Sequence, residues 1–141
     1  MVMPSVAVNY VGVLAAAVAS MIIGSVWYSP LLFGRVWMRL SGRSMKDVGK
    51  AKQRGMGKLY LMAFIGALVM AYVLAHFVQY LEVDSVVGVI QLVFWLWLGL
   101  IATVSLGVVL WEGKPWGLYV LNVVYQLISL IVMGVVLVLW P

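Results

Sequence analysis

The sequence predicts an all-α, polytopic membrane protein with four transmembrane helices and an interfacial amphipathic helix after the first of them. Of the 141 residues, 66% are hydrophobic and 9% are charged, whereas soluble domains carry about 25% charged residues. Apolar runs cover residues 5–28, 59–81, 86–111 and 116–140, and each is long enough to cross a hydrocarbon core of ~30 Å. Eight of the nine basic residues lie in segment 31–58. The chain is therefore predicted to be a single transmembrane domain whose basic segment connects two spans through water.

The first apolar run, residues 5–28, is predicted to be a retained helix rather than a cleaved signal peptide. No Lys or Arg precedes it, and apolar residues continue beyond its small-residue stretch at 15–20. Four small residues recur at four-residue spacing, namely Gly12, Ala16, Ser20 and Gly24. Such a face lets another helix backbone approach closely. Because Pro30 lacks a backbone N–H, the helix should end or kink near Trp27.

Segment 31–58 begins with an amphipathic pattern and continues as a short, polar, basic stretch. One face of residues 31–40 carries apolar side chains, and the other face carries arginines. We expect this part to lie in the membrane interface with its guanidinium groups toward lipid phosphates. The residues predicted to bind lipid headgroups are Arg35, Arg39, Arg43 and Lys46. The alternative interpretation is a solvated loop with a few apolar residues.

The second run, residues 59–81, has a small-residue face of its own, formed by Ala63, Ala67, Ala71 and Ala75. It is therefore the expected close-packing partner of the first helix. Only residues 82–85 separate it from the third run, so the second and third spans should form a tight hairpin. The third run carries Gly99, Thr103 and Gly107 at the same spacing. A short turn at 112–115 then leads into the fourth run.

The placement of charge predicts how the protein is oriented. All nine Lys and Arg residues lie either in segment 31–58 or in the turn after the third run. The N-terminal segment and the connection at 82–85 contain none. By the positive-inside rule, segment 31–58 should be cytoplasmic and both termini should lie outside. The predicted location is the cell's inner (cytoplasmic) membrane.

Several short motifs resemble those of a known family. They are Asn9, the run WYSPLLFG at 27–34 with Trp37, Gly57 with Tyr60, Glu112 and Gly113 with Pro115 and Trp116, and Asn122 with Tyr125. On these residues the chain is similar to the small bacterial membrane proteins catalogued as domain of unknown function 1761. The resemblance spans almost the whole chain and implies a four-helix membrane protein. It implies no established activity, ligand or catalytic residue.

Polar side chains inside the apolar runs form two predicted layers, because polar groups in hydrocarbon need partners or water. The inner layer, nearer the basic segment, holds Asn122, Tyr125, Gln126, Ser129, Thr103 and Ser105. The outer layer, near the opposite surface, holds Asn9, His76, Gln79 and Gln91. Either layer can consist of interhelical hydrogen bonds, at about 0.6 kcal/mol each, or of a solute-binding or permeation site. His76 titrates near neutral pH, so it is either a packing residue or a candidate proton carrier or ligand contact.

The composition argues against several classes of function. With no cysteine, one histidine and four scattered acids, the chain offers no triad, paired carboxylates or metal-ligand cluster. We therefore expect no enzyme activity, no cofactor and no metal. Nucleic acid is not an expected partner, because the basic residues lie beside membrane spans. The first run contains no acid or base, so the proton exchange that small multidrug transporters perform with an acid in that span is not available in that form.

Two functions remain after these exclusions. The first is a self-associating helical bundle that binds or passes a small solute or ion through the layer around Asn122, Gln126 and Thr103. The second is a structural or accessory subunit, in which the small-residue faces grip another membrane protein and the basic segment docks on anionic lipid. A solute site predicts a water-accessible cavity that reaches Gln126. An accessory subunit predicts that residues 122–129 are dry and directly hydrogen-bonded.

Overall fold

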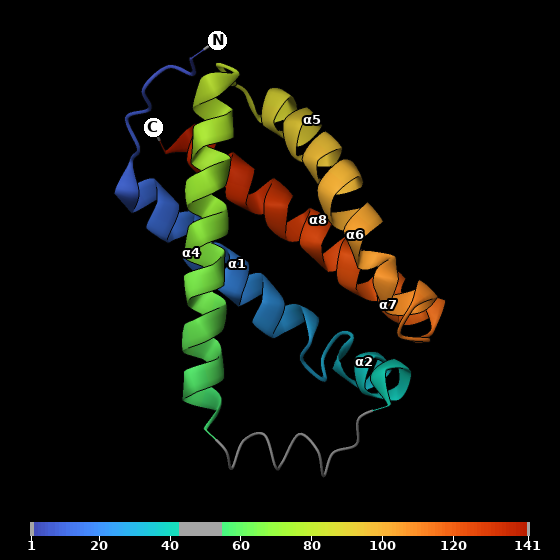
Figure 1. Cartoon of the computed structure of the whole chain (residues 1–141). Coiled ribbons are helices and arrows are strands. Elements are labelled where there is room, and N and C mark those ends of the chain that lie inside the picture. Colours follow the sequence, from blue (N-terminus) through green and yellow to red (C-terminus); the bar gives the residue numbers. More distant parts are fainter. Residues whose placement is uncertain (1, 43–54, 141) are drawn as a thin grey trace.

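The computed structural model describes residues 2–42 and 55–140, which are helical apart from the N-terminal segment and the turns (Figure 1). The helices are α1 (Tyr10–Trp27), α2 (Gly34–Ser41), α4 (Met56–Tyr80), α5 (Val86–Leu96), the π-helix η1 (Trp97–Ala102), α6 (Thr103–Ser105), α7 (Gly107–Leu110) and α8 (Trp116–Leu139). Four segments are long and apolar enough to cross a membrane: α1, α4, the composite helix Val86–Leu110, and α8. The all-α class with four membrane-spanning helices is confirmed. Two predicted headgroup ligands, Arg43 and Lys46, lie outside the described residues.

The first helix begins at Tyr10 rather than at the start of the apolar run. Asn9 caps it, because its side-chain Oδ1 accepts hydrogen bonds from the backbone N–H groups of Val11 and Gly12 at 3.1 and 3.2 Å. Such a cap satisfies donors that the first turn of a helix leaves unpaired. The polar Asn9 therefore sets where the span starts.

The chain turns tightly between α1 and α2. α1 ends at Trp27, before Pro30, as the sequence predicts. The backbone N–H groups of Phe33 and Gly34 then donate to the carbonyls of Trp27 and Ser29 at 3.0 and 2.9 Å. A Cβ on Gly34 would lie 2.8 Å from the carbonyl carbon and oxygen of Ser29. The turn therefore requires glycine at its last position. We refer to this turn, residues 27–34, as the corner.

The third span is not one regular helix. α5 passes into η1, and α6 and α7 follow with a break at Leu106. The hydroxyl of Thr103 donates to the carbonyl of Gly99 at 2.6 Å, within the irregular stretch. Such π-turns are uncommon and are frequent at functional sites. The apolar pattern of residues 86–111 does not distinguish a π-turn from an α-turn, so the sequence did not predict η1.

α8 occupies the centre of the bundle. It packs against α1, α4, α5, η1, α7 and α2, and α1 also packs along α4. α4 and α5 diverge from their short connection (Figure 1), and their mutual contact is weak. The connection is as short as predicted, but the two helices pack on α8 rather than on each other.

The small-residue faces of α1 and α4 are buried over part of their length, while Ala63 near the start of α4 is exposed. Ala16 and Ala71 are fully buried in one hydrophobic core with Ala75, which confirms the predicted packing of the second span on the first. The glycines of α1 face α8, since an added Cβ would lie 3.1 Å from the Trp140 carbonyl at Gly12 and 2.8 Å from the Tyr125 hydroxyl at Gly24. The small-residue face of α1 therefore packs against both α4 and α8.

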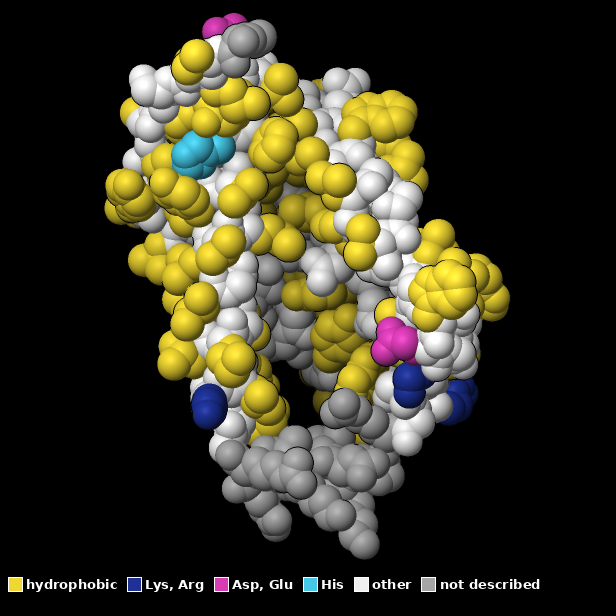
Figure 2. Space-filling view, viewed as in Figure 1, with side chains coloured by type: hydrophobic (Ala, Val, Ile, Leu, Met, Phe, Trp, Pro, Cys, Tyr) yellow, Lys and Arg dark blue, Asp and Glu magenta, His cyan; other side chains and the backbone are white. Residues whose placement is uncertain are grey.

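The bundle has two chemically different ends. The N-terminal segment, the α4–α5 connection and the end of α8 lie at one end, called here the termini end (Figure 1). The opposite end, called here the α2 end, holds α2, the start of α4 and the turn from α7 to α8. On the face shown in Figure 2, Lys and Arg side chains gather at the α2 end with an acidic side chain beside them, and acidic side chains also lie at the top of the termini end, where no Lys or Arg side chain is seen. The described chain is therefore polarised along its membrane-crossing axis.

Candidate functional site

The inner polar layer is centred on α8, which presents Asn122, Tyr125, Gln126 and Ser129 at i, i+3, i+4 and i+7. This spacing places the four side chains on one face of a helix. That face points toward α1 and the corner, as the contacts below show. We refer to these four residues as the α8 stripe.

Asn122 pairs with the corner. Its Oδ1 accepts a hydrogen bond of 2.7 Å from the hydroxyl of Tyr28, the residue just beyond the α1 span. Burial raises the pKa of Tyr28 to about 12, and the neighbouring Tyr125 adds to this rise. The hydroxyl therefore stays protonated and donates. The contact ties the first residue after α1 to the second turn of α8.

Aromatic rings surround this hydrogen bond. The Tyr125 ring lies edge-on to the Tyr28 ring at 5.2 Å between centroids and also contacts Trp27 at 6.3 Å. Phe33 and Trp37 extend the cluster, at 4.5 Å from Trp27 and 6.2 Å from Tyr28. Tilted and edge-on pairs of this kind each contribute about 0.5–1.5 kcal/mol beyond their burial. The corner is thus packed by aromatic side chains against the α8 stripe.

Ser129 makes the deepest contact of the stripe. Its hydroxyl lies 2.8 Å from the hydroxyl of Ser20 on α1, and both residues are buried. The Ser129 hydroxyl also lies 3.9 Å from the sulfur of Met133. Small residues let the two helices approach closely enough for this hydroxyl pair to form.

Three predicted members of the inner layer do not join it. Gln126 is half-buried, and its amide makes no hydrogen bond with the described part of the chain. Thr103 is exposed and bonds to its own helix. Ser105 is half-buried on α6, and no side-chain hydrogen bond joins it to the described residues. The π-turn redirects this part of the third span, so equal depth did not bring these side chains together.

Two other side chains join the third span to α8 instead. The indole N–H of Trp97 donates to the Val123 carbonyl at 2.7 Å. The Tyr119 hydroxyl donates to the carbonyl of Ala102, the last residue of η1, at 2.7 Å. Sequence reasoning missed both, since neither Trp97 nor Tyr119 was included in a predicted polar layer. Their polar atoms inside predicted spans are the signal that could have identified them.

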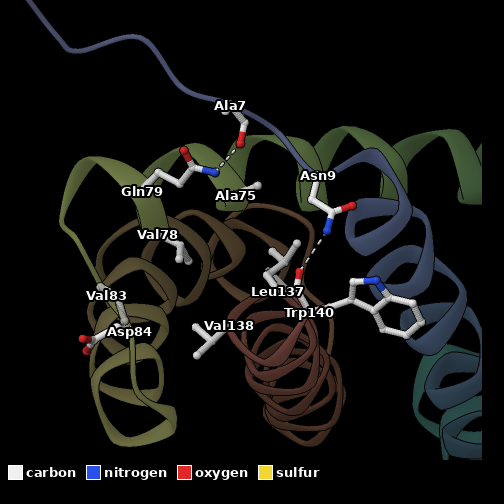
Figure 3. Close-up of a pocket in the computed structure, with 10 residues that line it drawn as sticks. All are labelled: Ala7, Asn9, Ala75, Val78, Gln79, Val83, Asp84, Leu137, Val138 and Trp140. Carbon is white, nitrogen blue, oxygen red and sulfur yellow. Dashed lines mark hydrogen bonds between the residues drawn. The ribbon is translucent and has the colours of Figure 1, made fainter.

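Two residues of the predicted outer layer, Asn9 and Gln79, line a pocket of about 430 Å³ at the termini end (Figure 3). The Gln79 amide donates to the Ala7 carbonyl at 2.6 Å, and the Asn9 amide lies 3.4 Å from the Trp140 carbonyl. Figure 3 shows these two contacts bridging the N-terminal segment to α4 and to the end of α8. Asp84 lies at the edge of the pocket. Asn9 and Gln79 are therefore brought together around one cavity.

His76 and Gln91 lie apart from this pocket. The His76 Nδ1 is 2.8 Å from the Tyr72 carbonyl of its own helix, and a carbonyl can only accept. Nδ1 therefore carries a proton and donates to this carbonyl. The rings of Tyr72 and Tyr80 flank the imidazole at 4.6 and 5.9 Å. Gln91 is exposed on α5, so neither side chain extends the outer layer.

The described part of the basic segment packs on the bundle with its apolar side. Arg35 and Arg39 are exposed on α2, while Leu40 lies where a Cβ on Gly117 of α8 would be 3.1 Å away. The ammonium group of Lys114 lies 3.4 Å from the Ser41 carbonyl. α2 is therefore held against the start of α8, with its guanidinium groups directed outward.

Comparison with known proteins identifies a family. No curated protein and no solved structure matches the chain. The family described as "Protein of unknown function (DUF1761)" matches residues 11–138, a range that contains the corner, η1 and the α8 stripe. Within residues 2–42 and 55–140, no group of three His, Asp or Glu side chains could hold a metal ion. The chain therefore belongs to the DUF1761 family of proteins of unknown function.

Proposed function

We propose that the chain is a non-enzymatic structural or accessory subunit of the inner (cytoplasmic) membrane. The observation that carries this proposal is the internal pairing of two residues at either end of the α8 stripe. Asn122 bonds to Tyr28, and Ser129 bonds to Ser20. Polar groups that are satisfied by neighbouring helices hold a bundle together and need no water. A conduit for solutes would instead keep such groups free along a wet path.

The outer surface of the third span supplies a face for a partner. Gly99 and Thr103 are exposed, and a Cβ added to Gly99 would meet no atom within 4 Å. Small residues at a helix surface favour close approach of another transmembrane helix. In this proposal the partner is another membrane protein, and α1 contributes nothing to the contact because its small-residue face is occupied internally.

The proposal also includes orientation and lipid contact. The α2 end faces the cytoplasm, because the basic segment belongs to it, and Arg35 and Arg39 meet anionic headgroups. Each cation near such a surface contributes about 1 kcal/mol. Both termini then lie outside.

Gln126 provides the sharpest test, since it is the one stripe residue whose amide is unpaired among the described residues. The chain contains no cysteine, so Gln126→Cys introduces a single reporter for a charged, water-soluble maleimide. We expect Cys at 126 to react as slowly as the lipid-facing control Leu100→Cys, while Asp84→Cys reacts rapidly. Fast reaction at 126, slowed by a small solute, would reject the accessory function and restore the solute pathway.

The pocket at the termini end favours a second candidate function, the binding of a small polar solute from the outer side. Its support is a cavity of about 430 Å³ lined by Asn9, Gln79 and Asp84. Gln79→Leu would remove an amide from this pocket without touching the α8 stripe. A solute whose binding depends on Gln79 but not on Asn122 would identify this function.

A further inference from the structure

An apolar groove separates α4 from the third span. It has a volume of about 380 Å³. Its lining residues are all apolar: Gly66, Val69, Met70, Val73, Leu74 and Phe77 of α4, Leu96 of α5, Leu100 and Ile101 of η1, and Leu130 of α8. Leu74 and Leu130 at its base belong to the buried core, whereas Val69 and Leu100 on its walls are 58% and 63% exposed. The groove exists because α4 and α5 diverge instead of packing together.

The groove lies at the depth of the hydrocarbon. Gly66 follows Lys58 by eight residues, which is about 12 Å of helix rise, and the lining stretch of α4 extends for roughly another 16 Å. Both ends of the groove therefore fall inside an apolar layer of ~30 Å. Water would find no hydrogen-bonding side chain there, so an apolar occupant is required.

The groove is large enough for one hydrocarbon chain. Its volume is about 380 Å³, and its lining stretch of α4 extends for roughly 16 Å, so a single extended acyl chain can lie along it.

The charges near the groove indicate which headgroup the bound lipid carries. Lys58 is exposed in the first turn of α4, the helix that lines the groove, and this turn lies at the α2 end. The described cations Arg35, Arg39 and Lys114 lie at this end as well and outnumber its one described acid, Glu112, whereas Glu82 and Asp84 lie at the opposite end. A phosphate held by Lys58 would place its lipid's acyl chains along α4 toward Gly66. We propose that the groove between α4 and the third span binds one acyl chain of an anionic phospholipid whose phosphate contacts Lys58.

Gly66 allows the site to be closed selectively. A Cβ at Gly66 meets no atom within 4 Å, so Gly66→Phe fills the groove without displacing the core. Gly57→Phe is the matched control, because Gly57 lies on the same helix with the same open space but outside the groove. In native mass spectrometry with phosphatidylglycerol, we expect Gly66→Phe to weaken retention of one lipid about tenfold, equivalent to 1.4 kcal/mol. Gly57→Phe should retain the lipid like the wild type.

Lys58 tests the headgroup separately. Lys58→Gln should reduce the preference for phosphatidylglycerol over phosphatidylcholine while leaving chain binding intact, and Lys114→Gln should not change that preference. A photocrosslinking experiment uses only the wild-type protein, so it does not depend on whether a variant folds. The probe is phosphatidylglycerol with a diazirine in its acyl chain. Photoadducts should concentrate at 66–77 and 96–101.

Three results would overturn the inference. Equal retention by Gly66→Phe and wild type would show that no chain occupies the groove. Adducts spread evenly over exposed positions such as Leu61 and Ile65 would show ordinary lipid contact around the bundle. Loss of a dimer, or of a co-purified membrane protein, in Gly66→Phe without loss of lipid would identify a second copy or a partner helix as the occupant.

Discussion

Tyr28 and Asn122 show how single residues hold the corner on the bundle. The hydrogen bond between them is one of modest energy, but removal of one partner leaves the other polar group half-buried and unpaired, which costs about 1–3 kcal/mol. The sequence correctly identified Asn122, Tyr125 and Ser129 as one face of a helix. It assigned them the wrong partners. The position of a residue along a helix gives the depth of its side chain in the membrane, but it does not show which way the side chains of a neighbouring helix point.

A double-mutant cycle measures the Tyr28–Asn122 bond. Tyr28→Phe and Asn122→Leu should each lower the free energy of unfolding in bicelles, and the coupling between them should be about 0.6 kcal/mol and at most about 1.7. Tyr60→Phe is the control, since Tyr60 is exposed on α4. Strict additivity of the two changes would show that the bond contributes nothing to stability.

Gly34→Ala tests the corner itself. The added Cβ would lie 2.5 Å from the Tyr28 carbonyl oxygen, so the backbone must shift, at a cost of about 1–3 kcal/mol, as for overpacked sites. Thermal unfolding should show a lower Tm for this variant. Gly57→Ala, on an open surface, should leave the Tm unchanged, and a wild-type Tm for Gly34→Ala would contradict the close approach.

Among the elements, the contrast between α4 and the third span is the most informative. The alanine face of α4 was predicted from its spacing, and packing confirms it because small residues at four-residue intervals have few other uses in a membrane helix. The π-turn η1 was not predicted, since its stabilising contacts are hydrogen bonds from Trp97 and Tyr119 to carbonyls. Backbone carbonyls are present at every position and leave no mark in a sequence.

The alanines of α4 are buried to different extents, so replacing them by leucine should change stability by different amounts. Ala71 is fully buried, so Ala71→Leu should overpack the contact with α1 and destabilise the protein by about 1–3 kcal/mol. Ala63→Leu, at an exposed position of the same face, should change stability by less than about 0.5 kcal/mol. Unfolding by denaturant in micelles provides the measurement, and equal effects at the two sites would contradict the α1–α4 contact.

The bonds of η1 can be tested by hydrogen exchange. Trp97→Phe removes the donor to the Val123 carbonyl while keeping an aromatic ring. Backbone amides of residues 97–102 should then exchange faster. Trp95→Phe, at a neighbouring side chain that is 66% exposed, should leave their exchange unchanged. Faster exchange in both variants would mean that the hydrogen bond is not what holds the π-turn.

For the whole molecule, the number of spans and the placement of the described connections at the two ends follow from the apolar runs. The pairing of the helices does not, because every run is apolar enough to face lipid or protein. α4 and α5 diverge because each packs more favourably on α8 than on the other. This preference depends on the shapes of the packing surfaces rather than on hydropathy.

Charge polarity along the bundle predicts a labelling result. Single cysteines at Asp84 and Lys114 lie at the termini end and the α2 end, respectively. In intact cells, an impermeant maleimide should label Asp84→Cys from outside, and Lys114→Cys should react only after the membrane is opened. Labelling of both from the same side would contradict the four-span topology, and exclusive outside labelling of Lys114→Cys would reverse the proposed orientation.

The central position of α8 has a consequence for biosynthesis. It is the last of the described helices to leave the ribosome, yet it holds the partners of Ser20, Tyr28 and Trp97. Until α8 inserts, the three earlier spans lie in the bilayer without the hydrogen-bond partners that α8 provides, and the hydrophobic core is incomplete. Nascent chains interrupted before residue 116 would therefore present to membrane proteases and insertion chaperones a degradation signal that the finished bundle conceals.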